Sequence, residues 1–345
     1  MKYQSLHGHS ILSDGVMTHE QILDECQKNN IGVVAVTDHD TLIKPEIFER
    51  IKNLNHRVKF VSGIELTADF VPETKIKIPA FHIVGLFVDP TNRPLLSHCE
   101  KLKKVRFDKV SKYVASFSEL GFSITENEIL AEVADGGTVG RPHVVAALNK
   151  KQSNRDLIEK FLEDFKNKAN TDNKLMVMVK EYENIPQERK DKARWFTLFL
   201  TPESPFSVYI HDPDDSLISI DQTVSFIRGA GGVALVAHWS FYDKKAFPLD
   251  LVEKLVQEKR IDGIETVYVF GEDLFLTPFS KDRQDLVLLS EKYNSIQGGG
   301  VDFHTVAHLQ AMSNPKYITD AKKTEKMVEK ILEKRPDLDT TWTTL

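Results

Sequence analysis

The sequence has few cysteines, no long apolar run and no strong excess of charge, and each absence excludes a class of protein. Cys26 and Cys99 are the only cysteines among 345 residues, too few for a disulfide framework and suited to a reducing compartment. No segment approaches the ~20 apolar residues of a membrane span, and the N-terminus lacks an apolar signal region. We therefore expect a cytoplasmic protein with no membrane partner and no obligate protein partner.

The charge is nearly balanced. Lys+Arg number 45 and Asp+Glu number 51, which gives a formal net charge of −6. This balance indicates neither a nucleic-acid coat nor a membrane surface, although a local basic groove can lie on an acidic protein. The length allows one elaborated domain or a catalytic domain with a smaller insertion.

Apolar segments that alternate with helical patterns mark the two ends of the chain. A strand is predicted for each of six segments: 31–36, 59–66, 81–88, 233–237, 263–269 and 295–298. Strands alternating with helices predict an α/β fold with a mostly parallel sheet or a barrel. Ligands bind at the strand C-terminal ends in such folds.

The middle of the chain has a different character. A helix is predicted at 96–120, two short helices within 124–148 and another helix at 155–168, whereas 174–200 is charged and is expected to be irregular. We therefore expect residues 1–95 and 221–345 to form the catalytic domain. Residues 96–220 are expected to form an α-rich insertion, either a cap beside the site or a structural decoration.

The two ends also carry helix signals. Thr18 and Gln21 have the spacing of a capping box and predict a helix that ends near Asn29. The tail at 320–332 has the pattern of one amphipathic helix.

Histidines and carboxylates gather near the ends of the predicted strands. Residues i and i+2 of an extended strand point to the same face, so His7 and His9 can chelate one cation. Asp302 and His304 repeat that spacing. Further candidates are Asp14 in the turn after the first pair, His39 after a buried strand and Glu65 at the end of the next strand.

Two more histidines lie in or beside apolar strands. His82 stands early in the strand at 81–88, and His238 follows the strand at 233–237. Each alone could be a hydrogen-bonded core histidine, and a lone His-x-His pair is often incidental. A fold that gathers the strand ends would bring together six imidazoles and three carboxylates, however, and burying them without partners would be very costly. Metal ions would compensate.

The number of candidate ligands exceeds what one ion takes. The nine are His7, His9, Asp14, His39, Glu65, His82, His238, Asp302 and His304. Two or three divalent ions are implied, and Glu65 is a candidate bridge. Mixed imidazole and carboxylate ligands suit Mn²⁺, Fe²⁺ or Zn²⁺ better than Mg²⁺ alone. Mn²⁺ is the metal we expect.

The motifs, in their order along the chain, resemble those of the PHP (polymerase and histidinol phosphatase) family. They are His7-x-His9, Ser13-Asp14-Gly15, Thr37-Asp38-His39-Asp40, Gly63-x-Glu65, His82-x-x-Gly85, Gly140-Arg141-Pro142-His143, Ala237-His238 and Asp302-x-His304. The Gly-Arg-Pro-His motif and the helical insertion are similar to those of the nucleotide phosphatase and 5′-to-3′ exoribonuclease branch. The resemblance covers about residues 5–150 and 220–305.

This resemblance implies a distorted (β/α)₇ barrel of the PHP type, with an α-rich insertion and a trinuclear metal centre. One ion would take His7, His9, Glu65 and Asp302; a second would take Glu65, His82 and His238; a third would take Asp14, His39 and His304. The chain departs from the family at Trp239, where proline is usual, and at Val301, where serine is usual. Both changes can reshape the substrate pocket.

The implied activity is hydrolysis of a phosphate ester by a metal-activated hydroxide. The residues predicted to be catalytic are Asp14, His39, Arg141 and His143. Arg141 would bind phosphate oxygens with its forked guanidinium, and His143 would bind or protonate the leaving oxygen. Arg106 is predicted to contact a second phosphate, although its basic helix can equally be a solvated face.

The expected substrate is small and phosphorylated. We expect the phosphate monoester of a nucleotide (a nucleoside 3′,5′-bisphosphate or 5′-phosphate) or the 5′ end of a short RNA. The alternatives are a phosphatase of another metabolite, such as histidinol phosphate, and a non-catalytic metal-binding scaffold.

Overall fold

The structure, a computed structural model, describes residues 1–54, 56–72, 81–185, 187–211, 216, 218–242, 244–269 and 279–345. These fall into two compact units. The first contains the described residues up to 103 and from 216 onwards, and the second contains 104–211. Helix α3 (Arg93–Asp108) runs from one into the other. None of the described helices has the length and apolar character needed to span a membrane.

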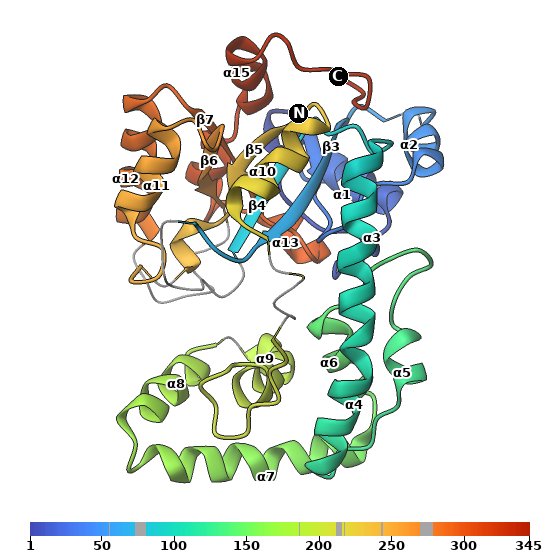
Figure 1. Ribbon diagram of the computed structural model, residues 1–345, viewed down its shortest axis with the longest axis vertical. Coiled ribbons are helices and arrows are strands. Elements are labelled where there is room, and N and C mark those ends of the chain that lie inside the picture. Colours follow the sequence, from blue (N-terminus) through green and yellow to red (C-terminus); the bar gives the residue numbers. More distant parts are fainter. Residues whose placement is uncertain are drawn as a thin grey trace. The chain divides into compact units, whose positions relative to one another are not determined.

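A seven-stranded sheet forms the centre of the first unit (Figure 1). In chain order, which is also their order in the sheet, its strands are β1 (Tyr3–Ser5), β2 (Ile31–Val36), β3 (Lys59–Ala68), β4 (Phe81–Leu86), β5 (Val233–Val236), β6 (Gly263–Tyr268) and β7 (Ile296–Gly300). All six predicted strands are confirmed, and β1 is an additional short strand. Neighbours pair in parallel except that β4 is antiparallel to both β3 and β5.

The reversed direction of β4 explains how a histidine near the start of a strand can join residues near the ends of others. His82 pairs with Thr67 on β3, and its carbonyl oxygen accepts a hydrogen bond from Ala237 N–H just after β5. The prediction that Glu65 ends its strand is wrong. Strand β3 continues to Ala68 because residues 66–68 pair with β4.

The first and last strands also meet. Leu6 N–H donates to the Gly299 carbonyl oxygen, and Gly8 and Phe303 form a parallel bridge beyond the two strand ends. A close approach of backbones requires Gly299 here. Its φ is +133°, and a Cβ atom would lie 2.0 Å from the Val267 carbonyl oxygen.

Helices pack around the sheet. Those of the first unit, besides α3, are α1 (His19–Lys28), α2 (Pro45–Lys52), α10 (Ile220–Gly229), α11 (Leu249–Gln257), α12 (Phe279–Lys292), α13 (Val306–Gln310), α14 (Ile318–Lys323) and α15 (Met327–Lys334), with short 3₁₀ turns η2 (Trp239–Phe241) and η4 (Ala311–Ser313). The capping box of Thr18 and Gln21 is confirmed, and α1 ends with Asn29 as its C-cap.

The prediction of one helix at 320–332 is wrong, because the chain breaks between α14 and α15. Lys326 adopts a left-handed conformation with φ 62°. The buried Thr324 hydroxyl accepts a hydrogen bond from Gln4 N–H, and the Gln4 side chain accepts one from Val328 N–H. These contacts tie the break to β1.

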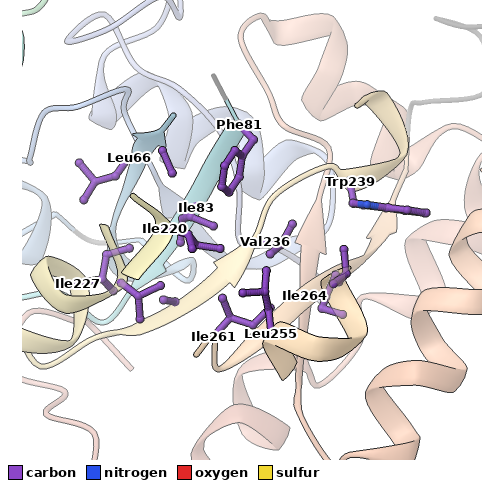
Figure 2. Close-up of a cluster of buried hydrophobic side chains, with 14 of the residues drawn as sticks. Leu66, Phe81, Ile83, Ile220, Ile227, Val236, Trp239, Leu255, Ile261 and Ile264 are labelled. Carbon is purple, nitrogen blue, oxygen red and sulfur yellow. The ribbon is translucent and has the colours of Figure 1, made fainter. Parts of the chain in front are cut away.

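Burial of apolar side chains holds the helices on the sheet. Figure 2 shows Leu66, Ile83, Val236 and Ile264 from four neighbouring strands packed with residues of α10 and α11. Trp239 belongs to this core, is 4% exposed and donates its indole N–H to the Phe247 carbonyl oxygen. Removing this much apolar surface from water is the main stabilising contribution, at roughly 25 cal/mol per Å².

The second unit is helical. It contains the end of α3 and α4 (Val110–Glu119), α5 (Glu126–Leu130), α6 (Arg141–Asn149), α7 (Gln152–Ala169), α8 (Asn173–Glu183) and α9 (Gln187–Phe199). The expected irregular stretch at 174–200 is therefore wrong. Asp172 caps α8, and Trp195, Leu198 and Phe199 on α9 are fully buried at helical spacing, so a narrow apolar face lies beneath the charged residues.

Candidate metal centre

The two i, i+2 motifs at opposite ends of the chain interlock. Gly8 pairs with Phe303, and His9 N–H donates to the Phe303 carbonyl oxygen at 2.7 Å. The Phe303 ring packs on Gly8, where a Cβ atom would lie 2.2 Å from ring carbons. Because successive side chains alternate in direction, the flanking His7, His9 and Asp302 meet on the other side. Asp302 Oδ1 lies 3.1 Å from His9 Nε2 and 3.5 Å from His7 Nε2.

Glu65 lies among five histidines. Its carboxylate is 1% exposed, and both oxygens face imidazole nitrogens. Those nitrogens lie 3.0–3.3 Å away: His82 Nδ1, His238 Nε2 and His7 Nε2 near Oε1, and His39 Nδ1 and His9 Nε2 near Oε2. Backbone hydrogen bonds from Glu65 N–H to the Asp38 carbonyl oxygen and from Asp40 N–H to the Glu65 carbonyl oxygen fix β3 against the loop that carries His39.

Asp14 gathers the remaining candidates. Its Oδ1 lies 3.4 Å from His304 Nε2, 3.7 Å from His9 Nδ1 and 3.9 Å from His39 Nε2. The turn that carries Asp14 is held by the buried Asp38, which accepts hydrogen bonds from Ser10 N–H and from two serine hydroxyls.

All nine predicted metal ligands therefore lie in one cluster of the first unit, and the donor set fits divalent cations. Four overlapping groups have ligand atoms within 4.8 Å of one another, and together they include all nine residues. Within the described part of the chain, six of the cluster's buried polar atoms have no hydrogen-bond partner: His7 Nε2, Asp14 Oδ1, His39 Nδ1, Glu65 Oε2, His238 Nδ1 and Asp302 Oδ1. Unsatisfied buried donors and acceptors are costly, and bound cations would satisfy most of them.

The electrostatics keep the carboxylates ionised. Burial alone would raise the pKa of Glu65, but the charges of His82, His39 and His7 outweigh it and hold that pKa well below its usual value. The pKa values of Asp14 and Asp302 are lowered in the same way, against burial, by neighbouring histidines.

The pKa values of the histidines shift in opposite directions. Burial would lower the pKa of His9, yet hydrogen bonds and charges from Asp302, Glu65 and Asp14 raise it to about 10. Burial dominates at His82 and lowers its pKa, with further lowering by the charges of His39 and His238. Ions entering this cluster would displace protons from the raised histidines, so metal binding and proton release are coupled.

Several residues that support the cluster were missed at the sequence level. Tyr268 O–H donates to Asp302 Oδ2 at 3.1 Å, Tyr242 O–H accepts from His82 N–H at 2.8 Å, and His308 Nδ1 accepts from His304 N–H at 3.0 Å. The buried carboxylate of Glu265 contacts two predicted ligands. In the sequence, Glu265 stands out only as an acidic residue within the apolar strand predicted at 263–269.

The predicted substrate residues lie in the second unit. Arg141 begins α6, and its guanidinium lies 5.5 Å from the centre of the Tyr209 ring. The buried His143 accepts a hydrogen bond from Gly140 N–H on Nδ1, which leaves the proton of a neutral ring on Nε2. Arg106 lies in the last turn of α3. Their contact with substrate stays a prediction.

Known proteins are similar to the chain over most of its length, although no protein-family model matches it. It is 23% identical to the 3′,5′-nucleoside bisphosphate phosphatase of Chromobacterium violaceum, over 87% of this chain and 86% of that protein. It is 24% identical to the 5′-3′ exoribonuclease Rnm of Escherichia coli, over 87% of this chain and 84% of that protein. A Bifidobacterium adolescentis structure, described as a metal-dependent phosphoesterase, matches with a TM-score of 0.64 and 21% identity over 95% of both chains. The last likeness indicates a shared fold.

Proposed function

We propose that this chain is a metal-dependent phosphoesterase of the PHP type that acts on nucleotides or RNA. The chain is a hydrolase of phosphate ester bonds, as are the phosphatase and the exoribonuclease to which it is similar over most of their lengths. The observation that carries the proposal is the cluster of six imidazoles and three carboxylates around the buried Glu65.

We propose the ligand assignment that the family resemblance implies. His7, His9, Glu65 and Asp302 would hold one ion; Glu65, His82 and His238 a second; and Asp14, His39 and His304 a third. The 3.4 Å between His82 Nδ1 and His238 Nε2, each 3.0 Å from Glu65 Oε1, supports the second group. We propose Mn²⁺ as the metal, with Fe²⁺, Zn²⁺ or Mg²⁺ as alternatives.

The fold that presents these ligands is proposed to be a distorted (β/α)₇ barrel, with an α-rich insertion between its two halves. The hydrogen bond between Leu6 and Gly299 and the bridge between Gly8 and Phe303 support it, because they join the first strand to the last. Four strands contribute Ala35, Val61, Val84 and Leu235 to one buried apolar cluster that also contains residues of α15, which is consistent with an enclosed interior.

The residues of this chain would bind and orient the phosphate. When bound, divalent ions lower the pKa of coordinated water and neutralise charge on phosphoryl oxygens. Arg141 would form forked hydrogen bonds to phosphate oxygens. The neutral His143 carries its proton on Nε2 and can donate it to the leaving oxygen. Arg106 would contact a second phosphate.

The substrate we propose is a nucleoside 3′,5′-bisphosphate, a nucleoside 5′-phosphate or the 5′ end of a short RNA. The names of the two relatives favour this choice. A phosphatase of another metabolite, such as histidinol phosphate, is the alternative that the same metal cluster would serve.

The activity is tested by assaying purified protein with Mn²⁺ for release of phosphate. His9→Ala and Asp302→Ala should each abolish hydrolysis, because each residue contributes an atom to the centre of the cluster. His56→Ala is a suitable control, since His56 is a partly exposed histidine of the first unit that pairs only loosely, at 3.7 Å, with Asp24. Full activity in protein stripped of metal would contradict the proposal.

The substrate is tested with a panel. Nucleoside monophosphates, 3′,5′-bisphosphates, short 5′-phosphorylated RNA and histidinol phosphate should be compared by kcat/KM, with Arg141→Ala and His143→Ala assayed on the best of them. A clear preference for histidinol phosphate would reverse the ranking of the two substrate classes.

A further inference from the structure

Glu265 on β6 is a buried carboxylate that contacts two predicted metal ligands at once. It is 5% exposed. Its Oε1 lies 2.8 Å from His7 Nδ1, and its Oε2 accepts a hydrogen bond from the backbone N–H of His238 at 2.8 Å. No residue of the second unit takes part in either contact.

The first contact determines how His7 presents its ring. A carboxylate only accepts hydrogen bonds, so Glu265 places a proton on His7 Nδ1. The other nitrogen, Nε2, then faces Glu65 Oε1 at 3.3 Å and Asp302 Oδ1 at 3.5 Å, inside the cluster. A neutral His7 therefore directs a lone pair, and not a proton, toward the metal position.

The second contact determines where His238 points. The backbone of His238 has φ 29°, a conformation that residues other than glycine adopt rarely and at a cost. Because this conformation persists only when its surroundings fix it, the hydrogen bond to Glu265 is a direct restraint on it. With the backbone held so, His238 Nε2 lies 3.0 Å from Glu65 Oε1.

We propose that Glu265 is a positioning residue that sets the geometry of two neighbouring metal sites through one side chain. The inference rests on the proposed metal centre, in which His7 and His238 belong to different ions. One carboxylate would thus couple the two sites that share Glu65. The third site, formed by Asp14, His39 and His304, would be independent of it.

The test is Mn²⁺ binding by wild-type protein and by Glu265→Gln. A glutamine keeps the size of the side chain but can accept from only one of the two donors, and its amide N–H₂ opposes the other. Loss of a residue that orients ligands weakens metal affinity about 10–100-fold. We expect a loss of this size at two of the three sites, seen by titration calorimetry and by metal content after dialysis.

Glu253→Gln is the matched control. Glu253 also accepts two hydrogen bonds, from Lys292 and Tyr293, but touches none of the predicted ligands. The Glu253→Gln protein should bind Mn²⁺ with the affinity of the wild type. A Glu265→Gln protein that loses stability in urea when metal-free, yet binds Mn²⁺ with unchanged affinity, would overturn the inference and assign Glu265 a structural role alone.

A measurement on the wild-type protein keeps the inference testable if the variant does not fold. In ¹⁵N-histidine spectra of Zn²⁺-loaded protein, His7 should carry its proton on Nδ1. A proton on Nε2 would refute the inference. Wild-type protein that binds no divalent ion would instead contradict the proposed function, so the two failures are distinguishable.

Discussion

Asp38 offers a stringent test of how the Asp14 turn is held, because it has no predicted contact with metal or substrate. The residue is 2% exposed and accepts hydrogen bonds from Ser10 N–H at 2.7 Å, Ser10 O–H at 2.6 Å and Ser13 O–H at 2.6 Å. We predict that Asp38→Ala destabilises the first unit and loosens the turn that carries Asp14.

The magnitude follows from these contacts. Hydrogen bonds to a charged group contribute about 1.5–3 kcal/mol each. The Ser13 hydroxyl has a second neighbour, His9 Nδ1 at 3.3 Å, so its bond is partly replaced. The two hydrogen bonds from Ser10 to Asp38 have no such replacement. We therefore expect Asp38→Ala to lower the free energy of unfolding by about 3–5 kcal/mol. Asp38→Asn keeps one acceptor oxygen and should cost less than half as much.

Urea denaturation followed by circular dichroism measures these losses. A double-mutant cycle with Ser13→Ala should give a coupling free energy of about 1 kcal/mol, because the two side chains share one hydrogen bond. The reasoning is refuted if the free energy of unfolding of Asp38→Ala lies within about 1 kcal/mol of the wild-type value. It is also refuted if the losses caused by the two substitutions simply add in the double mutant.

Three further predictions concern packing and protonation. Gly8→Ala should prevent metal binding, measured by calorimetry, because its Cβ atom would overlap the Phe303 ring. Burial lowers the pKa of both His19 and His98, so each of these two side chains binds protons more readily in the unfolded chain, and their contribution to stability should decrease as the pH falls below about 6.5. Replacing both histidines with asparagine should remove that contribution, so the change in the free energy of unfolding from about pH 7 to about pH 5 should be more favourable to folding in the variant than in the wild type. Trp239→Ala should lower the free energy of unfolding by about 3–5 kcal/mol in urea, because it leaves a cavity in the core.

The sequence allowed prediction of the ligands better than of the elements that carry them. Spacing alone places His7 with His9 and Asp302 with His304, because alternation along an extended backbone depends on no distant residue. The direction of β4 was not predictable, since an apolar run reads the same in a parallel and an antiparallel strand. The sequence also did not show that Glu65 lies inside β3, because the residues after it belong to the strand only through their pairing with β4.

Residues that act through tertiary contacts were also beyond prediction. Glu265 lies about 258 positions from His7 in the chain, and only the fold brings their side chains together. The helices at 173–199 were missed because charged residues outnumber the few buried positions, such as Leu175 and Trp195, that hold them to the core.

Two of the predicted ligands have a strained backbone conformation, as do several residues outside the cluster, such as Lys326. His238 and Asp302 have φ of 29° and 45°, and such conformations cost of order 1–3 kcal/mol each. Glycine adopts such conformations without this cost, as at Gly231 and Gly299. Both positions instead keep side chains that reach the cluster, His238 to Glu65 and Asp302 to His9. Glycine would therefore relieve the strain at these two positions only by removing a predicted metal ligand.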